Sequence, residues 1–144
     1  MTIIAFASDH GALELKTTLM EYVSDSFKFQ TVDFGVHNLE SVDYPDYADK
    51  VVNAILNQEA TLGILCCGTG IGISIRANRY KGIRAALVYD SMTAEMAKAH
   101  NNANILCFGG RTTHIQDAKD YLSIWLNTAY EGGRHQRRLD KLDL

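Results

Sequence analysis

The chain has 144 residues, of which 47% are apolar and 22% are charged, and it carries a net charge of −3. These values are typical of one soluble globular domain and argue against a nucleic-acid-binding surface, although the last residues are locally basic. Apolar runs are far shorter than the roughly 20 residues of a membrane span, and the N-terminal pattern is unlike a signal peptide, so we expect a cytoplasmic protein without nucleic-acid or membrane partners.

Strand and helix patterns alternate along the chain. Short apolar runs predict strands, whereas apolar residues three or four positions apart predict helices. Pro45, the only proline, suits the first turn of a helix, and Gly132-Gly133 separates a last charged segment from the helix before it. In chain order, the predicted elements are strand 3–7, helix 12–24, strand 29–34, helix 45–57, strand 62–67, helix 70–79, strand 83–88, helix 91–99, strand 104–108, helix 114–128 and a last helix of about 131–143.

This alternation predicts a Rossmann-like three-layer α/β sandwich, with residues 1–144 as a single domain around a five-stranded parallel sheet that has helices on both faces. In such sheets, sites form beyond the carboxyl ends of the strands. Reactive residue types follow four of the predicted strands, namely Asp9-His10, Cys67-Gly68-Thr69, Tyr89-Asp90 and Gly110-Arg111. We therefore expect these residues to gather at one edge of the sheet.

The most informative stretch is a glycine-rich turn, Gly68-Thr69-Gly70-Ile71-Gly72, which directly follows a predicted buried strand. Glycines at alternate positions let the backbone bend sharply and direct its N–H groups toward a bound anion or oxygen. The spacing matches neither the dinucleotide fingerprint nor a Walker A loop. The stretch is interpreted either as an anion-binding loop or simply as a tight connection between strand and helix.

Three cysteines are present, and their odd number without a C-x-x-C pair predicts reduced cytosolic thiols. Cys67 lies where strand becomes turn, just before the expected start of a helix, whose partial positive charge favours a thiolate. Neighbouring strand residues face opposite sides, so we interpret Cys66, like Cys107, as a core residue and Cys67 as functional. The alternative for Cys67 is a small buried apolar residue.

Two other polar positions are candidates for acid–base chemistry. Asp9 either caps the helix that follows it or contributes to the site. His100 ends a predicted helix, where the helix dipole favours a histidine, or it acts as a general acid or base. Spacing alone leaves His37 and His114 as loop or cap residues and gives His135 no role.

The C-terminal segment is rich in arginine. Arg134 and Arg138 share one face if the segment is helical, and like charges at that spacing repel each other. A bound anion would relieve this repulsion, because the arginine fork suits phosphate oxygens. The alternative is a solvated basic tail whose arginines pair with nearby acidic residues, namely Glu131, Asp140 and Asp143.

Six motifs occur in an order that closely resembles the type B ribose-5-phosphate isomerases, whose superfamily includes the galactose-6-phosphate isomerase subunits. The resemblance spans nearly the whole chain, and the motifs together are very specific. They are Ala7-Ser8-Asp9-His10-Gly11, residues 42–48 (VDYPDYA), residues 67–74 (CGTGIGIS), His100-Asn101, Phe108-Gly109-Gly110-Arg111 and residues 130–135 (YEGGRH).

The resemblance implies an aldose–ketose isomerase that interconverts ribose 5-phosphate and ribulose 5-phosphate through a cis-enediol without metal or cofactor. It assigns the base to Cys67 and ring opening to Thr69 and His100, with Asp9 also in the catalytic set. The spacing of histidine, cysteine and carboxylate residues likewise shows no convincing metal-ligand cluster. The remaining substrate contacts implied are His10, Tyr44, Gly68, Gly70, Ile71, Gly72 and Asn101, with Arg111, Arg134 and Arg138 at the phosphate.

The resemblance also implies a homodimer or homotetramer whose active site is shared across the dimer interface, with the C-terminal helix serving a neighbouring subunit. His100-Asn101 and the C-terminal arginines would complete the partner's site. Two departures from the family pattern are Arg76, where a small residue is common, and Ala12-Leu13, which replaces a glycine–aromatic pair and is expected at the pocket rim.

Three other functions compete with this interpretation. A hexose-6-phosphate isomerase for allose or galactose 6-phosphate is one, although galactose enzymes need two different subunits and a different C-terminal segment. A non-catalytic sugar-phosphate-binding module would share the fold and the glycine loop. A redox or phosphatase enzyme that uses Cys67 is disfavoured, since the C-x5-R loop of a phosphatase would need arginine where Ile73 stands.

Overall fold

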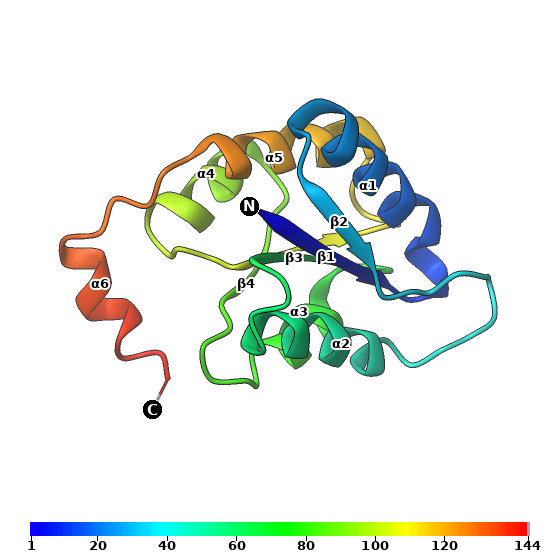
Figure 1. The fold of residues 1–144 in the computed structure, drawn as a ribbon, viewed down its shortest axis with the longest axis horizontal. Helices are drawn as coiled ribbons and strands as arrows, with labels where there is room; N and C mark the ends of the chain where they lie inside the picture. The colour runs from blue at the N-terminus through cyan, green and yellow to red at the C-terminus, as the bar shows by residue number, and fades with distance from the viewer. Residues whose placement is uncertain (144) are drawn as a thin grey trace.

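The computed structural model describes residues 1–143, and it confirms an α/β fold built on an all-parallel sheet. Five strands lie in the order β2-β1-β3-β5-β4, with helices on both faces (Figure 1). The strands are β1 Ile3–Ser8, β2 Gln30–Asp33, β3 Leu62–Cys67, β4 Ala85–Leu87 and β5 Ile105–Gly109. The helices are the short 3-10 helix η1 His10–Ala12, then α1 Leu13–Phe27, α2 Tyr44–Leu56, α3 Ile71–Ala77, α4 Ser91–Ala99, α5 Ile115–Asn127 and α6 Arg134–Leu139.

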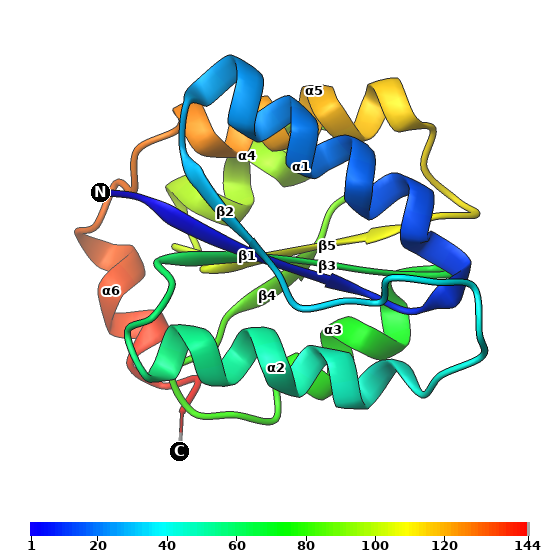
Figure 2. The same cartoon turned by 45° about the vertical axis from the view of Figure 1, so that its right-hand side comes forward.

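Two apolar cores hold the layers together, one on each face of the sheet. Helices α1, α4 and α5 cover one face, and α2 and α3 cover the other (Figure 2). Alternate strand residues supply the two cores, so Cys66 packs in the first core, whereas Cys67 and Cys107 pack in the second. No helix within residues 1–143 is long and apolar enough to cross a membrane.

Several predicted elements were longer than the observed ones, and for two of them the structure shows why. The strand over 83–88 is limited to Ala85–Leu87, because the Arg84 N–H donates to the Asn104 side chain instead of to a neighbouring strand, at 2.8 Å. The last helix covers only Arg134–Leu139, because Gly132 and Gly133 both have positive φ angles, 67° and 58°, which exclude them from a right-handed helix.

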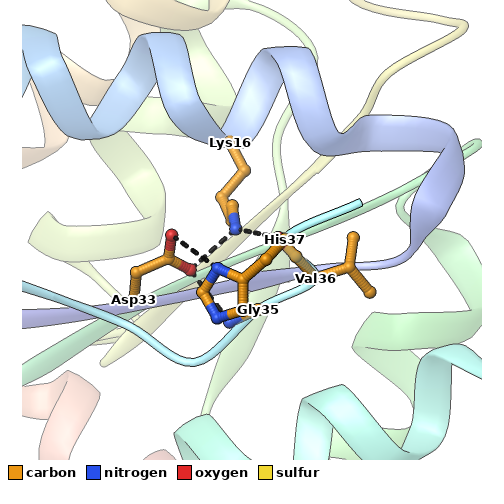
Figure 3. A network of polar contacts seen from close by, with 5 residues as sticks. All are labelled: Lys16, Asp33, Gly35, Val36 and His37. Atoms are coloured by element: carbon orange, nitrogen blue, oxygen red, sulfur yellow. Dashed lines mark hydrogen bonds and ion pairs between the residues drawn. The ribbon is translucent and has the colours of Figure 1, made fainter. Parts of the chain in front are cut away.

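A buried polar network fixes the loop between β2 and α2. The Lys16 side chain on α1 is fully buried and donates to the Asp33 carboxylate at 2.7 Å and to the Val36 carbonyl at 2.5 Å. Asp33 also accepts from the Gly35 N–H at 2.9 Å and lies 3.7 Å from His37, which is exposed (Figure 3). This loop leads to Tyr44, a candidate site residue and the first residue of α2, so the network sets the position at which α2 begins.

Candidate active site

The strand order reverses between β1 and β3, so the ends of these two strands are the expected place for a ligand. The chain moves from β1 to β2 on one side and from β2 to β3 on the other, so the order reverses at this point. Open α/β sheets bind ligands where such a reversal separates the loops at the carboxyl ends of neighbouring strands. Ser8 pairs with Cys66, and the Asp9 N–H donates to the Cys66 carbonyl at 3.2 Å, so Asp9 and Cys67 leave the sheet side by side.

The Cys67 sulfur is held by the glycine loop. The Gly70 N–H donates to Sγ at 3.2 Å, and only 4% of Cys67 is exposed. Gly70 has a φ angle of 77°, and a Cβ there would lie 2.9 Å from the Phe108 backbone, so both conformation and space require glycine. The Thr69 hydroxyl accepts from the Ile71 N–H at 3.3 Å, which fixes the threonine within the glycine loop.

The other two cysteines confirm the core assignment. Cys66 and Cys107 are completely buried, and burial raises the pKa of both thiols well above the ordinary value of 9.0. Both are therefore neutral thiols at physiological pH, and neither is poised to remove a proton.

The loop after β5 packs directly on the glycine loop. The Gly110 N–H donates to the Cys67 carbonyl at 2.8 Å, and the Arg111 N–H donates to the Gly68 carbonyl at 2.9 Å. The Arg111 guanidinium lies against the bare backbone of Gly68 and Gly11, where an added Cβ would be 3.3 Å and 3.8 Å from its nitrogens. One cation thus spans the loops that follow β1 and β3.

Asp9 and His10 are both held by backbone N–H groups. The Asp9 carboxylate accepts from the Gly11 N–H at 3.0 Å and caps η1, which confirms the capping interpretation of this residue. His10 Nδ1 accepts from the Val42 N–H at 3.2 Å, so the loop before α2 orients the imidazole. His10 is partly buried, and its ring is fixed by contacts 32 residues away in the chain.

Tyr44, at the start of α2, packs against Gly72 of the glycine loop. It is 37% exposed, and a Cβ on Gly72 would lie 2.5 Å from its hydroxyl oxygen, so the missing side chain makes room for the tyrosine. Ala12 is buried against Gly110, with 3.1 Å between its Cβ and the position of an added Cβ. Ala12 therefore packs against the loop that follows β5.

A second set of predicted site residues lies away from the glycine loop. His100, Asn101, Arg134 and Arg138 line a pocket of about 250 Å³ together with His135 and Leu139. His100 ends α4 and precedes β5, so this pocket belongs to the amino edge of the sheet. Figure 2 shows α6 on the side where β1 begins, away from the loops that follow the strand ends.

The structure thus brings the predicted residues together in two groups. The carboxyl-edge group holds the loops after β1, β3 and β5 with Tyr44, whereas the amino-edge group holds the end of α4 with α6. The expectation that the residues after the strands gather at one edge of the sheet concerned the first group. Asp90 caps α4, and its pKa is lowered because its carboxylate accepts hydrogen bonds from Thr93, so its role there is structural.

The alternative of a self-paired basic tail was wrong. Each acidic residue proposed to pair with the arginines contacts something else. Glu131 lies 3.5 Å from His135 Nε2 and 3.8 Å from His100 Nε2. Asp140 accepts from Gln136 at 2.8 Å, and Asp143 accepts from the Gly82 N–H at 3.0 Å.

Arg76 is bound to a neighbouring helix. Its guanidinium donates to both carboxylate oxygens of Asp49 on α2, at 2.8 and 3.2 Å, and to the Tyr80 hydroxyl at 3.1 Å. These hydrogen bonds hold the pKa of Asp49 below its ordinary value of 3.8. The residue therefore joins α2 to α3, which explains a large side chain at this position.

Two residues near His100 were missed by the sequence analysis. His135, which is buried, stacks on His100 with ring centroids 4.1 Å apart, and Glu131 faces both rings. Positions 131 and 135 are four apart, a spacing that could have suggested a pair. His100 lies 31 residues earlier, so only the fold brings the three together.

A family model described as Ribose/Galactose Isomerase matches residues 4–142 of the chain. The chain belongs to the ribose/galactose isomerase family. Ribose-5-phosphate isomerase B of Escherichia coli strain K12 is 39% identical, and the match covers 99% of this chain and 95% of that protein.

Solved structures of ribose-5-phosphate isomerases are also similar to this chain, in sequence and in fold. A ribose 5-phosphate isomerase from Thermotoga maritima is 50% identical, with a TM-score of 0.96 and coverage of 99% of this chain and 97% of the other. Ribose-5-phosphate isomerase B from Clostridium thermocellum is 42% identical, with a TM-score of 0.96 and coverage of 99% and 95%. The protein is therefore a sugar-phosphate aldose–ketose isomerase of this family.

Proposed function

We propose that this isomerase interconverts ribose 5-phosphate and ribulose 5-phosphate through a cis-enediol, with Cys67 as the base and without a metal or cofactor. The observation that carries the proposal is the position of the Cys67 sulfur, which lies at the end of β3 and accepts a hydrogen bond from the Gly70 N–H. Relatives named ribose-5-phosphate isomerase, at 39% and 50% identity over nearly the whole chain, support the choice of sugar.

Aldose–ketose isomerisation requires a base next to groups that stabilise negative charge on the carbonyl oxygen. Cys67 removes the proton from C2 of the open-chain aldose, the electron pair forms the C1–C2 double bond, and the carbonyl oxygen becomes an enediolate. Moving the proton of the C2 hydroxyl to the C1 oxygen, and returning the abstracted proton to C1, gives the ketose. Backbone N–H groups of the 68–72 loop stabilise that oxygen, an effect worth several kcal/mol in a site that excludes water.

Before this step the furanose ring has to open. We assign this task to His100 and Thr69, which move the proton between the anomeric hydroxyl and the ring oxygen, with Asp9 assisting. The sugar then contacts His10, Tyr44 and Asn101 together with the glycine loop. The phosphate binds Arg111, Arg134 and Arg138, so remote binding energy holds C1 and C2 against the base.

A site of this composition requires two chains. Within one chain, the carboxyl-edge and amino-edge groups belong to opposite ends of the strands. A second copy, as dimer or tetramer, would bring its His100-Asn101 and its α6 arginines to Cys67. This arrangement accounts for exposed arginines at positions 134 and 138 that face a pocket with no acidic residue among its lining.

A panel of sugar phosphates tests the proposal. We expect the largest kcat/KM with ribose 5-phosphate, and smaller values with allose 6-phosphate and galactose 6-phosphate. A higher kcat/KM with a hexose phosphate would assign the protein to the hexose branch of the family. Binding of sugar phosphates without turnover of any of them would favour a binding module and contradict the proposed reaction.

A further inference from the structure

Three metal-ligating side chains converge at the amino edge of the sheet, away from Cys67 and the glycine loop. His100 ends α4, Glu131 lies in the segment after α5, and His135 belongs to the first turn of α6. One ligand atom from each lies within 4.8 Å of the other two. The Nε2 atoms of His100 and His135 lie 3.8 Å and 3.5 Å from the same carboxylate oxygen of Glu131, so the three donor groups are close together.

Two imidazoles and one carboxylate are a ligand set that zinc accepts. Catalytic zinc sites use three such protein ligands at distances of about 2.0–2.2 Å and leave a fourth position to water. The two rings are stacked with centroids 4.1 Å apart and 18° between their planes, so both side chains have to turn out of the stack before their in-plane Nε2 lone pairs can meet at one ion. Hard cations such as Mg²⁺ prefer oxygen ligands and fit this set poorly.

The backbone around the cluster already holds it in place. The Glu131 N–H donates to the Ala99 carbonyl at 3.0 Å, which fixes Glu131 against the end of α4. The His135 N–H donates to the Gly132 carbonyl at 3.2 Å, and only 7% of His135 is exposed. The backbone of two of the three ligands is therefore in place before any ion binds, which reduces the entropy that binding has to overcome.

We propose that His100, Glu131 and His135 form a Zn²⁺ site, and that its occupation inhibits the isomerase by taking His100 away from the sugar. The inhibitory part rests on the proposed role of His100 in ring opening, whereas metal binding does not. Arg134 and Arg138 line a pocket with His100 and His135 and repel a cation. Their charge lowers the affinity, so the site acts as a reversible inhibitory site and not as a permanent structural one.

Calorimetric titration of the full-length protein with Zn²⁺ tests the site directly. We expect one Zn²⁺ per chain, and an affinity lowered about tenfold or more in Glu131→Gln, since even residues behind the ligands cost that much. Glu21→Gln is the matched control, because Glu21 is exposed on α1 and far along the chain from the cluster. Its affinity should equal that of the wild type, and Mg²⁺ should give no binding.

A second variant guards against an indirect effect of the first. His135→Asn removes a ligand from α6 and should weaken Zn²⁺ binding as Glu131→Gln does, with circular dichroism and thermal unfolding confirming the fold. Zn²⁺ binding that is equally tight in the wild type and both variants would overturn the proposal, because a thiol such as Cys67 would then be the ligand. Absence of binding to the wild type would overturn it as well.

Inhibition is measured with the same proteins. Zn²⁺ should reduce turnover of ribose 5-phosphate by the wild type, a chelator should restore it, and Glu131→Gln should need about tenfold more Zn²⁺ for the same effect. Equal inhibition of wild type and Glu131→Gln would contradict the proposal. A wild type that binds Zn²⁺ through these residues but turns over no sugar phosphate would support the site and count against the proposed function.

Discussion

Cys67 and His100 lie at opposite edges of the same sheet. Cys67 pairs with Gly109 at the carboxyl end of β3 and β5, whereas four residues earlier Gly63 pairs with Ile105, the residue that begins β5 after His100. Four residues of strand span about 13 Å. The two side chains of one chain are therefore too far apart to act on the same small sugar, and they can share a site only if it is formed by two chains.

Mixing two defective variants, assayed at a substrate concentration far below the KM of the wild type, tests this shared site. Cys67→Ala lacks the base and Arg134→Ala lacks a phosphate contact, but a mixed dimer contains one site in which both residues are intact. With random exchange of subunits in a symmetric dimer, about a quarter of wild-type activity should return. Activity no greater than the sum of the two variants, with exchange verified by mass spectrometry, would contradict a shared site.

Arg134 and Arg138 of α6 line the pocket, so they should contribute to substrate binding, whereas Arg137 should not. Arg134→Ala should raise the KM for ribose 5-phosphate about tenfold or more, as expected for loss of a hydrogen bond from a charged group, with little change in kcat. Arg137 is exposed on the same helix but does not line the pocket, so Arg137→Ala should leave KM unchanged. Equal effects of both substitutions would indicate only a diffuse effect of positive charge.

The buried Lys16–Asp33 pair should respond unequally to loss of either partner. Asp33→Asn leaves a buried ammonium group without its counter-charge and should lower the free energy of unfolding by about 3 kcal/mol. Lys16→Met replaces the buried charge with an apolar chain, while the carboxylate of Asp33 stays partly exposed, and should cost only about 1 kcal/mol. Urea denaturation of both variants measures the difference, and a larger loss in Lys16→Met would contradict this explanation.

The Asp49–Arg76 pair should contribute to stability in a pH-dependent way. The pKa of Asp49 is lower in the folded protein than its ordinary value of 3.8, so the pair stabilises the fold above about pH 4. This contribution is lost as the pH falls through the lowered value. Both side chains are partly exposed, which limits the effect to about 1 kcal/mol or less.

Thermal unfolding of wild type and Asp49→Asn at several pH values measures that contribution. The two melting temperatures should differ at pH 7 and converge as the pH falls below 3.8. A difference that stays constant over the whole range would show that the carboxylate charge is not what Asp49 contributes.

Local patterns were enough to predict the fold. The strand over 62–67 and the helix over 91–99 were placed at their exact bounds, because apolar periodicity and the Asp90 cap are properties of short segments. The α/β class, and the placement of the residues that follow the strands at one edge of the sheet, followed from the order of these segments. Local pattern failed at β4, where the hydrogen bond from the Arg84 N–H to the Asn104 side chain limits the strand. It also failed at α6, because two glycines delay the start of that helix.

The candidate site was predictable only in part for a similar reason. The glycine loop and Cys67 are contiguous, so the sequence shows them together. The meeting of His100 with Glu131 and His135, and that of Arg76 with Asp49, depend on how distant helices pack. Spacing in the sequence carries no information about such contacts, so only the structure could find them.

The most direct test of the account is ketose formation from ribose 5-phosphate, measured with a chelator present for wild type, Cys67→Ala and Cys107→Ala. Cys107 is a fully buried thiol on the neighbouring strand and serves as the matched control. We predict turnover in wild type and Cys107→Ala, and nearly complete loss in a folded Cys67→Ala that still binds phosphate. Substantial turnover by Cys67→Ala would contradict the assignment of Cys67 as the base.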